Sequence, residues 1–407
     1  MQIDADNLIW VEHRDRELGY ARLLADQIAR AGLGSTNILS LAFHLPLGTL
    51  LSPRRVFVPY LRSANDEGLS ILRRAPRQVF NINYEQLLGN FNREAKRPRC
   101  SGVMQLYWYD AFREILDDWE VPDSLRVRLP PPESLLLTER AREQEWHRTR
   151  DGRLHDRIVF LPENYAWAFA DSETLRKKAG VGFRMEQIER LRDYSRDSLQ
   201  AFARELLAYS AAHPDVVFVL RPHPSVSIET YESELRRHGE IPINLILSKA
   251  GSAWDWVGCS DAVISGWSTV TYSASQLGVP TALHLPLPLI PELDVPWVAA
   301  MPRFRSFQDA VDHLLSGCWQ ADASTEDCSN FEELLAAMRS GSHMIDCPPG
   351  LGRIRVFLRS LISSAVRYLG LIWRPANVRV LSVYHADHFK PIHISTSTSS
   401  YCHATSS

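Results

Sequence analysis

The chain has 407 residues, of which 45% are hydrophobic and 23% charged, and its formal net charge is −3. This composition is typical of a globular protein, and the length predicts two domains. A net charge so close to zero gives no general attraction to nucleic acid or to anionic lipid. The six cysteines are scattered without a CxxC pair, which argues against a disulfide scaffold or a zinc site and favours a reducing compartment.

No targeting or membrane-spanning segment is expected. Residues 1–18 lack a cationic start followed by an apolar stretch of signal-peptide length. A spanning helix would need about 18 consecutive apolar residues, and the sequence has no such run. These patterns predict a cytoplasmic protein.

The first half of the chain alternates between apolar runs and helical patterns. Strands are expected at 7–11, 37–43, 55–61 and 78–86, and helices at 16–31 and 103–118. The second of these helices includes the aromatic stretch LYWYDAF (106–112), which we interpret as core or interdomain packing rather than as a surface for stacking sugars. A proline-rich, highly charged segment at 128–153 then interrupts the pattern and predicts a domain boundary.

The second half repeats the alternation. Strands are expected at 157–165, 216–220, 243–248, 261–269 and 278–284, and helices at 185–212, 251–260 and 270–277. Buried strands that alternate with helices predict an α/β fold with parallel sheets and right-handed crossovers. We expect a first domain over 1–128, a linker over 129–155, a second domain over 156–345, an amphipathic C-terminal helix over 346–380 and a disordered tail over 381–407.

Two strand ends in the second domain carry residues suited to an anion. The strand VVFVL runs directly into Arg221 and His223, each beside a proline. Arginine offers a fixed fork of donors, histidine can donate a hydrogen bond or exchange a proton, and the prolines restrict the backbone. The alternative is a simple turn with a structural histidine.

The second strand end is DAVISGWST. Gly266 permits a close backbone approach, and Ser268 or Thr269 can cap the helix that follows, whose free N–H groups favour an anion. The alternative is an ordinary N-cap. Because ligands of parallel sheets lie beyond the carboxyl ends of the strands, both strand ends can flank one phosphate site. The loop LPENYAW (161–167) is expected at the same edge.

RPHP followed about 45 residues later by a strand, GWST, a helix and LGVP resembles the second half of bacterial surface-carbohydrate glycosyltransferases of the GT-B architecture. In the first half, EHRDRELGYARLLADQIARAG, VPYLR, NINYEQLLG and KRPRC followed by LYWYDAFREIL resemble the same family. Its relatives are capsule transferases that use CMP-activated sugars and glycerophosphotransferases that use CDP-glycerol. The resemblance, over roughly 8–285, implies two Rossmann-like domains that face each other across a cleft.

The resemblance also implies roles for individual residues. His223, Ser268 and Thr269 would contact the donor phosphates, Arg221 would support them, and no metal ion would be needed. The sequence itself shows no cluster of carboxylates that resembles a magnesium site.

The acidic loop that supplies the base in better-understood relatives has no clear match. Transfer to a hydroxyl needs a general base, and the candidates in the first domain are Glu12, Asp15, Glu17 and Glu85. We prefer Glu17 as the base, although a carboxylate at a helix start also has a purely structural role. Glu85 is preferred for acceptor binding, and Asn83 and Tyr84 are expected to line the same wall.

A last feature is the basic, apolar segment IRVFLRSLISSAVRYLGLIWR (354–374). It can lie on an anionic membrane surface or pack as a C-terminal helix on the first domain, and we favour the second interpretation because the arginines do not form one clean polar face.

The leading hypothesis is a glycosyltransferase of surface polysaccharide biosynthesis with a nucleotide-activated donor, a glycan or glycolipid acceptor, no metal and no nucleic-acid partner. Its location would be the cytoplasm, with peripheral association at the inner face of the membrane. A nucleotide-sugar 2-epimerase and an inactive nucleotide-binding partner protein are the alternatives.

Overall fold

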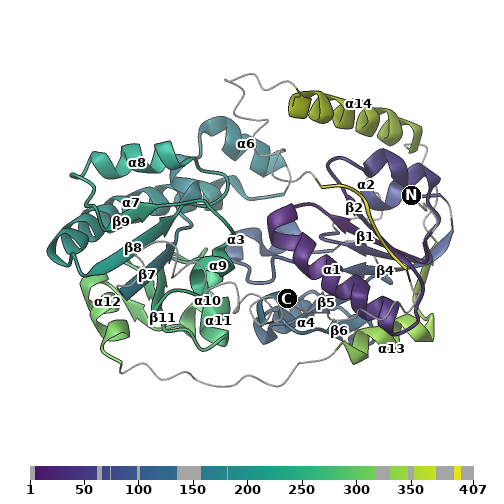
Figure 1. Cartoon of the computed structure of the whole chain (residues 1–407), viewed down its shortest axis with the longest axis horizontal. Helices are drawn as coiled ribbons and strands as arrows, with labels where there is room; N and C mark the ends of the chain where they lie inside the picture. Colours follow the sequence, from purple (N-terminus) through teal and green to yellow (C-terminus); the bar gives the residue numbers. More distant parts are fainter. Residues whose placement is uncertain are drawn as a thin grey trace, which may run out of the picture.

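The computed structural model describes residues 5–61, 67–73, 75–98, 101–134, 157–180, 182–317, 331–346, 353–372 and 389–395. These residues form two α/β domains, each built on a sheet of mainly parallel strands (Figure 1). The predicted fold class is confirmed.

The first sheet has eight strands, and its parallel part has the order β2–β1–β3–β4–β5–β6. Two strands from the end of the chain join it in antiparallel fashion, β14 beside β2 and β13 beside the first half of β4. The strands of this sheet are β1 (Asn7–Val11), β2 (Thr36–Ser40), β3 (Arg55–Val58), β4 (Pro76–Asn81), β5 (Met104–Tyr107), β6 (Arg126–Arg128), β13 (Met344–Asp346) and β14 (Ile392–Ile394).

The second sheet has six strands, all parallel, in the order β12–β11–β10–β7–β8–β9. They are β7 (Arg157–Pro162), β8 (Val216–Arg221), β9 (Leu245–Leu247), β10 (Ala262–Ser265), β11 (Thr281–His284) and β12 (Arg303–Phe304).

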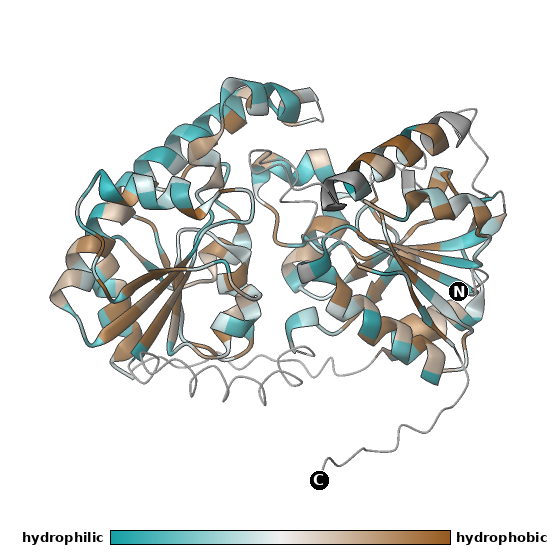
Figure 2. Ribbon diagram, turned by 45° about the horizontal axis from the view of Figure 1, so that its top comes forward, coloured by the Kyte–Doolittle hydropathy of each residue, from teal (hydrophilic) through white to brown (hydrophobic). Residues whose placement is uncertain are grey.

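Helices cover both faces of each sheet because successive strand side chains point to opposite faces. In β7, Val159 and Leu161 pack in the cluster that contains residues of α7, α8 and α12, whereas Ile158 and Phe160 pack with residues of α9 and α10. Figure 2 shows these strands as apolar ribbons inside the domain. The helices of the second domain are η4 (Ala166–Phe169), α6 (Ser172–Gly180), α7 (Met185–Ala212), α8 (Ile228–Arg236), α9 (Ala253–Val257), α10 (Thr269–Gln276), α11 (Pro296–Ala299) and α12 (Phe307–Leu315).

The first domain follows the same plan. In β1, Ile9 and Val11 pack with residues of α1, whereas Leu8 and Trp10 pack toward η1 and α2. Its described helices are α1 (Arg14–Arg30), η1 (Leu45–Leu50), α2 (Glu67–Ser70), α3 (Asn90–Arg93), η2 (Glu94–Lys96), α4 (Asp110–Asp118), η3 (Asp123–Leu125), α13 (Glu332–Ser340) and α14 (Arg353–Ile372). Among the helices that the structure describes, none combines the length and the hydropathy that crossing a bilayer requires.

Two predictions about the first domain need correction. The helix expected at 103–118 is the strand β5 followed by α4, because residues 104–107 pair in parallel with β4 and β6. The limit at 345 is also displaced, since α13 and β13 lie on the first sheet. Buried side chains of that sheet hold α13: the Gln78 amide donates to Ala337 O at 3.0 Å, and the Arg55 guanidinium donates to Met338 O at 3.3 Å.

The tail also differs from expectation where it is described. Residues 392–394 form β14 rather than a disordered segment, while residues 396–407 lie outside the described residues, as do 135–156 of the expected linker.

The two domains are in direct contact. Asn90 of the first domain donates its side-chain amide to Pro291 O (2.7 Å) and Asp294 O (3.0 Å), and its backbone N–H to Glu292 O (2.9 Å). Phe91 packs edge-on against Trp267 of the second domain at a ring distance of 5.9 Å. One buried apolar cluster therefore continues from one domain into the other.

Candidate functional site

The candidate site lies where the strand order of each sheet changes direction, which is the usual ligand position in parallel sheets. In the second sheet the strand order changes direction between β7 and β10, so the loops after these strands leave toward opposite sides and open a place for a ligand. In the first sheet the corresponding point lies between β1 and β3, and the first turn of α1 follows β1 there. The predicted RPHP, PENY and GWST loops follow the carboxyl ends of three adjacent strands, β8, β7 and β10.

Arg221 ends β8 and binds backbone. Its guanidinium donates to Ala250 O at 2.9 Å and to Gly251 O at 2.8 Å. These carbonyls lie in the turn before α9, which begins with a capping box between Ser252 and Asp255. In this structure Arg221 holds the neighbouring loop, and the phosphate contact that the resemblance implies for it stays a prediction.

His223 has a defined tautomer. The backbone N–H of Ser225 donates to His223 Nδ1 at 3.2 Å, and the Ser225 hydroxyl lies 2.8 Å from the same atom. Because a backbone N–H can only donate, Nδ1 accepts, and the neutral ring carries its proton on Nε2. The histidine thus presents a donor.

The surroundings of His223 are strongly basic. Burial, and then the positive charges of Lys249, Arg16, Lys178 and His13, lower the pKa of His223 to about 4. Lys249 follows β9 and Lys178 belongs to α6 of the second domain, whereas Arg16 and His13 lie at the start of α1 in the first. Positive charge from both domains therefore converges where a donor anion is predicted.

Gly266 is required by a protein contact. A Cβ at this position would lie 2.6 Å from the hydroxyl oxygen of Tyr165, which follows β7. Ser268 caps α10 as predicted, because its hydroxyl accepts from the Val270 N–H at 3.3 Å. Thr269, the first residue of α10, is exposed. The close approach to the Gly266 backbone is thus made by a tyrosine side chain, and the start of α10 is capped by Ser268.

The preferred base, Glu17, is fully buried and its oxygens are occupied. Oε2 accepts from the Glu12 N–H at 2.7 Å, and Oε1 accepts from Arg16 at 2.6 Å. Burial raises the pKa of Glu17, and Arg16 opposes this rise. Glu85 is exposed and forms ion pairs with Arg16 (3.1 Å) and Lys96. Both carboxylates therefore hold Arg16, one of the cations that face His223.

The remaining candidates of the first domain have other positions. The Glu12 side chain is exposed, and the Asp15 side chain lies outside the described residues. Asn83 adopts a left-handed backbone (φ 56°) and is buried, with its amide donating to Asn81 O at 3.1 Å and to Gln105 at 3.1 Å. Asn83 is thus a structural residue rather than part of an open acceptor wall.

Tyr84 packs in an aromatic cluster with Tyr20 and Trp108, at ring distances of 6.3 and 6.2 Å. The aromatic stretch after β5 serves packing as predicted, because Trp108 is buried in that cluster and Tyr109 packs edge-on against Tyr272 of α10.

Two buried carboxyl groups lie near the site and were not predicted from the sequence. Glu133 follows the three prolines at the start of the predicted linker. It lies at the domain interface beside Tyr109 and Ser273, whose hydroxyls are 2.5 Å apart. Burial raises the pKa of Glu133 to about 7, while hydrogen bonds with Tyr109 and Ser273 oppose the rise. Its Oε2 is buried without a hydrogen-bond partner.

Glu163 follows β7 in the loop that was expected at this edge. It is 2% exposed, and burial raises its pKa well above the ordinary value, while a hydrogen bond from the Asn164 backbone opposes this rise. The signal for both residues was present in the sequence only as an acidic residue within a few positions of a strand end, a pattern too common to select them.

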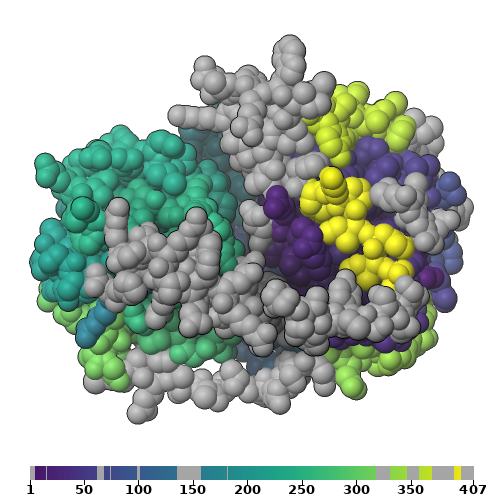
Figure 3. Space-filling model, in the orientation of Figure 1, coloured from purple at the N-terminus to yellow at the C-terminus, as the bar shows by residue number. Residues whose placement is uncertain are grey.

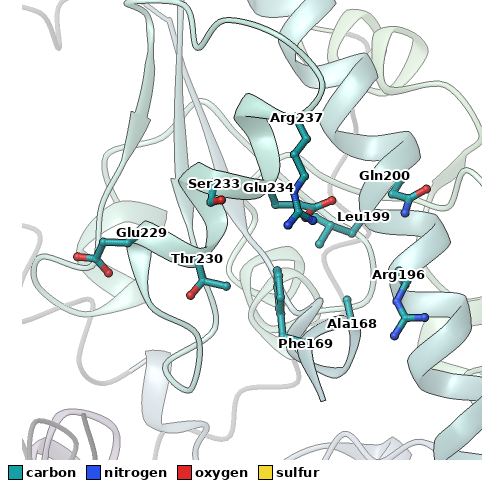
Figure 4. A pocket seen from close by; sticks show the side chains of 10 residues that line it. All are labelled: Ala168, Phe169, Arg196, Leu199, Gln200, Glu229, Thr230, Ser233, Glu234 and Arg237. Carbon is teal, nitrogen blue, oxygen red and sulfur yellow. The ribbon is translucent and has the colours of Figure 1, made fainter. Parts of the chain in front are cut away.

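A pocket of about 430 Å³ lies beside this edge, between η4, α7 and α8 (Figure 4). Phe169, Leu199, Thr230 and Glu234 are among its lining residues, and no residue predicted for the site belongs to it.

Comparisons with known proteins give distant structural matches and no sequence match. The chain matches no family model and no curated protein sequence. A solved structure of the wall teichoic acid polymerase TagF aligns with 89% of this chain and 90% of its own at 11% identity and a TM-score of 0.42. A UDP-N-acetylglucosamine 2-epimerase from Rickettsia bellii aligns with 89% and 97% of the two chains (11% identity, TM-score 0.44).

A putative UDP-N-acetylglucosamine 2-epimerase from Listeria monocytogenes aligns with 89% of this chain and 96% of its own, at 10% identity and a TM-score of 0.48. Matches at this level do not decide between activities, and the fold assignment rests on the two sheets themselves.

Proposed function

We propose that this protein is an enzyme that binds a nucleotide-activated sugar or polyol between its domains and transfers the activated group to a glycan or glycolipid acceptor. The observation that carries the proposal is the set of cations around the neutral imidazole of His223. The Lys249 ammonium donates to Pro224 O of the RPHP loop at 3.0 Å, and burial, together with its charge and those of Arg16, Lys178 and His13, lowers the pKa of His223. A diphosphate or phosphodiester is the ligand that such a site would neutralise.

In this proposal His223 donates from Nε2 to a phosphate oxygen, and the surrounding cations stabilise the charge that develops on the leaving nucleotide. These basic groups would act without a metal ion, which predicts that a chelator leaves nucleotide affinity unchanged. Glu17 and Glu85 would position Arg16 and would not contact the reacting atoms.

Transfer to a hydroxyl also needs a general base. We propose Glu133 for this role in place of Glu17, because its pKa of about 7 suits proton transfer near neutral pH and its Oε2 has no hydrogen-bond partner. Glu133→Gln should abolish turnover and leave nucleotide affinity intact, whereas Glu17→Gln should weaken nucleotide binding by releasing Arg16.

The family resemblance supports a cytidine nucleotide, a cytoplasmic location and a role in capsule or other surface polysaccharide synthesis. Isothermal titration with CMP, CDP, UMP and UDP tests the donor site. We expect a cytidine nucleotide to bind best and His223→Ala to weaken binding about tenfold or more, as the loss of a charge-assisted hydrogen bond would. His313→Ala, which removes an exposed histidine in the last turn of α12, is the matched control.

Other outcomes of the nucleotide titration would support a different function. A preference for uridine nucleotides would transfer the assignment to the 2-epimerase class. Binding without any turnover of activated donors would indicate a non-catalytic partner protein. If no nucleotide binds, the donor site is refuted and RPHP is a structural turn.

A further inference from the structure

The C-terminal helix α14 packs on the first domain with its less apolar side. Ser360 and Ser364 are buried, and Phe357 packs against the apolar cluster between β1, β3 and η1. Tyr368 packs edge-on against Phe43 at 5.5 Å, and Arg367 donates to Ala42 O. The prediction that this helix packs on the first domain is therefore confirmed, but the face that makes the contact was not foreseen.

The apolar face of α14 points to solvent. Leu358 is 52% exposed, Leu361 46%, Ile362 64% and Val366 56%. Residues spaced by three and four positions share one side of a helix, so these four form a continuous stripe about two turns long. We call it the α14 stripe. α14 lies at the surface of the first domain, at the upper right of Figures 1 and 3.

The stripe is unusual within this molecule. Five of the eight large apolar side chains that are exposed in the described part of the chain belong to α14, counting Tyr368 with the stripe. Single exposed apolar residues are ordinary, whereas a contiguous group marks a surface that contacts something else. Folding alone would favour the opposite rotation of the helix, with leucines inward and serines outward.

The charge of the helix indicates which surface it contacts. Residues 353–372 contain four arginines and no acidic residue. Arg359 is exposed directly after Leu358, and Arg73, which donates to Thr49 O, adds an exposed cation on the η1 turn where α14 packs. An exposed apolar stripe with Arg359 beside it and Arg73 at the neighbouring η1 turn matches a membrane surface that carries anionic headgroups.

We propose that the α14 stripe docks this protein on an anionic lipid bilayer, with the helix lying in the plane of the interface. The helix is 20 residues long, so it would lie along about 30 Å of the surface. Because η1 follows the carboxyl end of β2, docking would place the ligand-facing edge of the first sheet near the membrane. The inference does not depend on the donor site.

Vesicle co-sedimentation of the full chain tests it. Wild-type protein should bind vesicles of phosphatidylglycerol and phosphatidylcholine, bind pure phosphatidylcholine weakly and dissociate as salt is raised. The double variant Leu361→Gln/Ile362→Gln should lower the partition coefficient about tenfold or more. Arg359→Gln should lower it about fivefold, the effect of one lysine or arginine near an anionic surface.

Ile243→Gln is the matched control, because Ile243 is 87% exposed and lies in the second domain away from the stripe. It should leave vesicle binding unchanged, and circular dichroism should show that all variants fold. Absence of binding to anionic vesicles, or equal binding by wild type and the double variant, overturns the proposal. Dimers that the double variant dissociates, without vesicle binding, would instead assign the stripe to a second copy of the chain. Nucleotide titration without vesicles keeps failure here separate from failure of the donor site.

Discussion

Replacing Glu133 by glutamine should make the protein more stable at neutral and alkaline pH but not in acid. The carboxyl group lies at the domain interface beside Tyr109 and Ser273, and burial raises its pKa from 4.5 to about 7. In the unfolded chain the group ionises above pH 4.5, whereas the folded protein resists ionisation up to about pH 7. Wild-type stability is therefore lost as pH rises from 4.5 to 7, and the full penalty remains above 7.

The size of the effect follows from the two pKa values. A rise from 4.5 to about 7 corresponds to a penalty of at most about 3 kcal/mol above pH 7, at about 1.4 kcal/mol for each pH unit. At pH 5 this penalty is less than about 1 kcal/mol. The stability difference between Glu133→Gln and wild type should thus grow by about 2 kcal/mol between pH 5 and pH 8. If the glutamine amide fits the site less well than the carboxyl group, the stability of the variant falls by the same amount at every pH. The change of the stability difference between pH 5 and pH 8 stays the same.

Urea unfolding at pH 5, 6, 7 and 8, followed by tryptophan fluorescence, measures the difference. Glu240→Gln is the control, because Glu240 is exposed and its carboxylate stays in water on folding. Curves for Glu133→Gln and wild type that stay parallel across this range would refute the burial of an ionisable carboxyl at the interface.

Three further predictions concern the contacts around the site. Gly266→Ala should lower the free energy of unfolding of the second domain by about 1–3 kcal/mol in urea, because the new methyl group meets the Tyr165 hydroxyl. The double variant Gly266→Ala/Tyr165→Phe should recover part of this loss, and an equal loss in both variants would contradict the proposed clash. Nucleotide binding should be accompanied by proton uptake at pH 6, because a bound anion offsets the positive charges of Lys249, Arg16, Lys178 and His13 and raises the pKa of His223 from about 4. Calorimetric titration in buffers of different ionisation enthalpy measures this uptake, which should vanish in His223→Ala. Asn90→Ala should weaken the contact between the domains by about 1–3 kcal/mol, because Pro291 O and Asp294 O lose their hydrogen-bond donor. Backbone hydrogen exchange at residues 291–294 should then be faster. Unchanged exchange there would show that the contact is not maintained in solution.

The sequence alone determined most of the architecture. Apolar runs at 7–11, 157–165 and 216–220 correspond to β1, β7 and β8, and the helix expected at 185–212 has the bounds of α7. These elements are long or fully buried, so hydrophobic pattern dominates their structure. The position of the RPHP, PENY and GWST loops at one edge of the second sheet also followed from the sequence, because strands that alternate with helices must be parallel.

Tertiary structure decided the rest. Residues 104–107 look helical in isolation, and only their pairing with β4 and β6 makes them a strand. Glu17 and Glu85 resembled reactive carboxylates, but Glu17 pairs with its sequence neighbour Arg16, and the fold brings Glu85 to the same guanidinium. The fold also places Glu133 beside Tyr109 and beside Ser273 of the other domain, where burial raises its pKa. The sequence shows the helical spacing of the apolar residues in α14, but it does not show which face of the helix packs on the domain. That face depends on the surface that η1 provides. Local pattern therefore predicts most of the elements, whereas the strand at 104–107, the burial and ionisation of side chains, and the exposed surface depend on contacts between residues far apart in the chain.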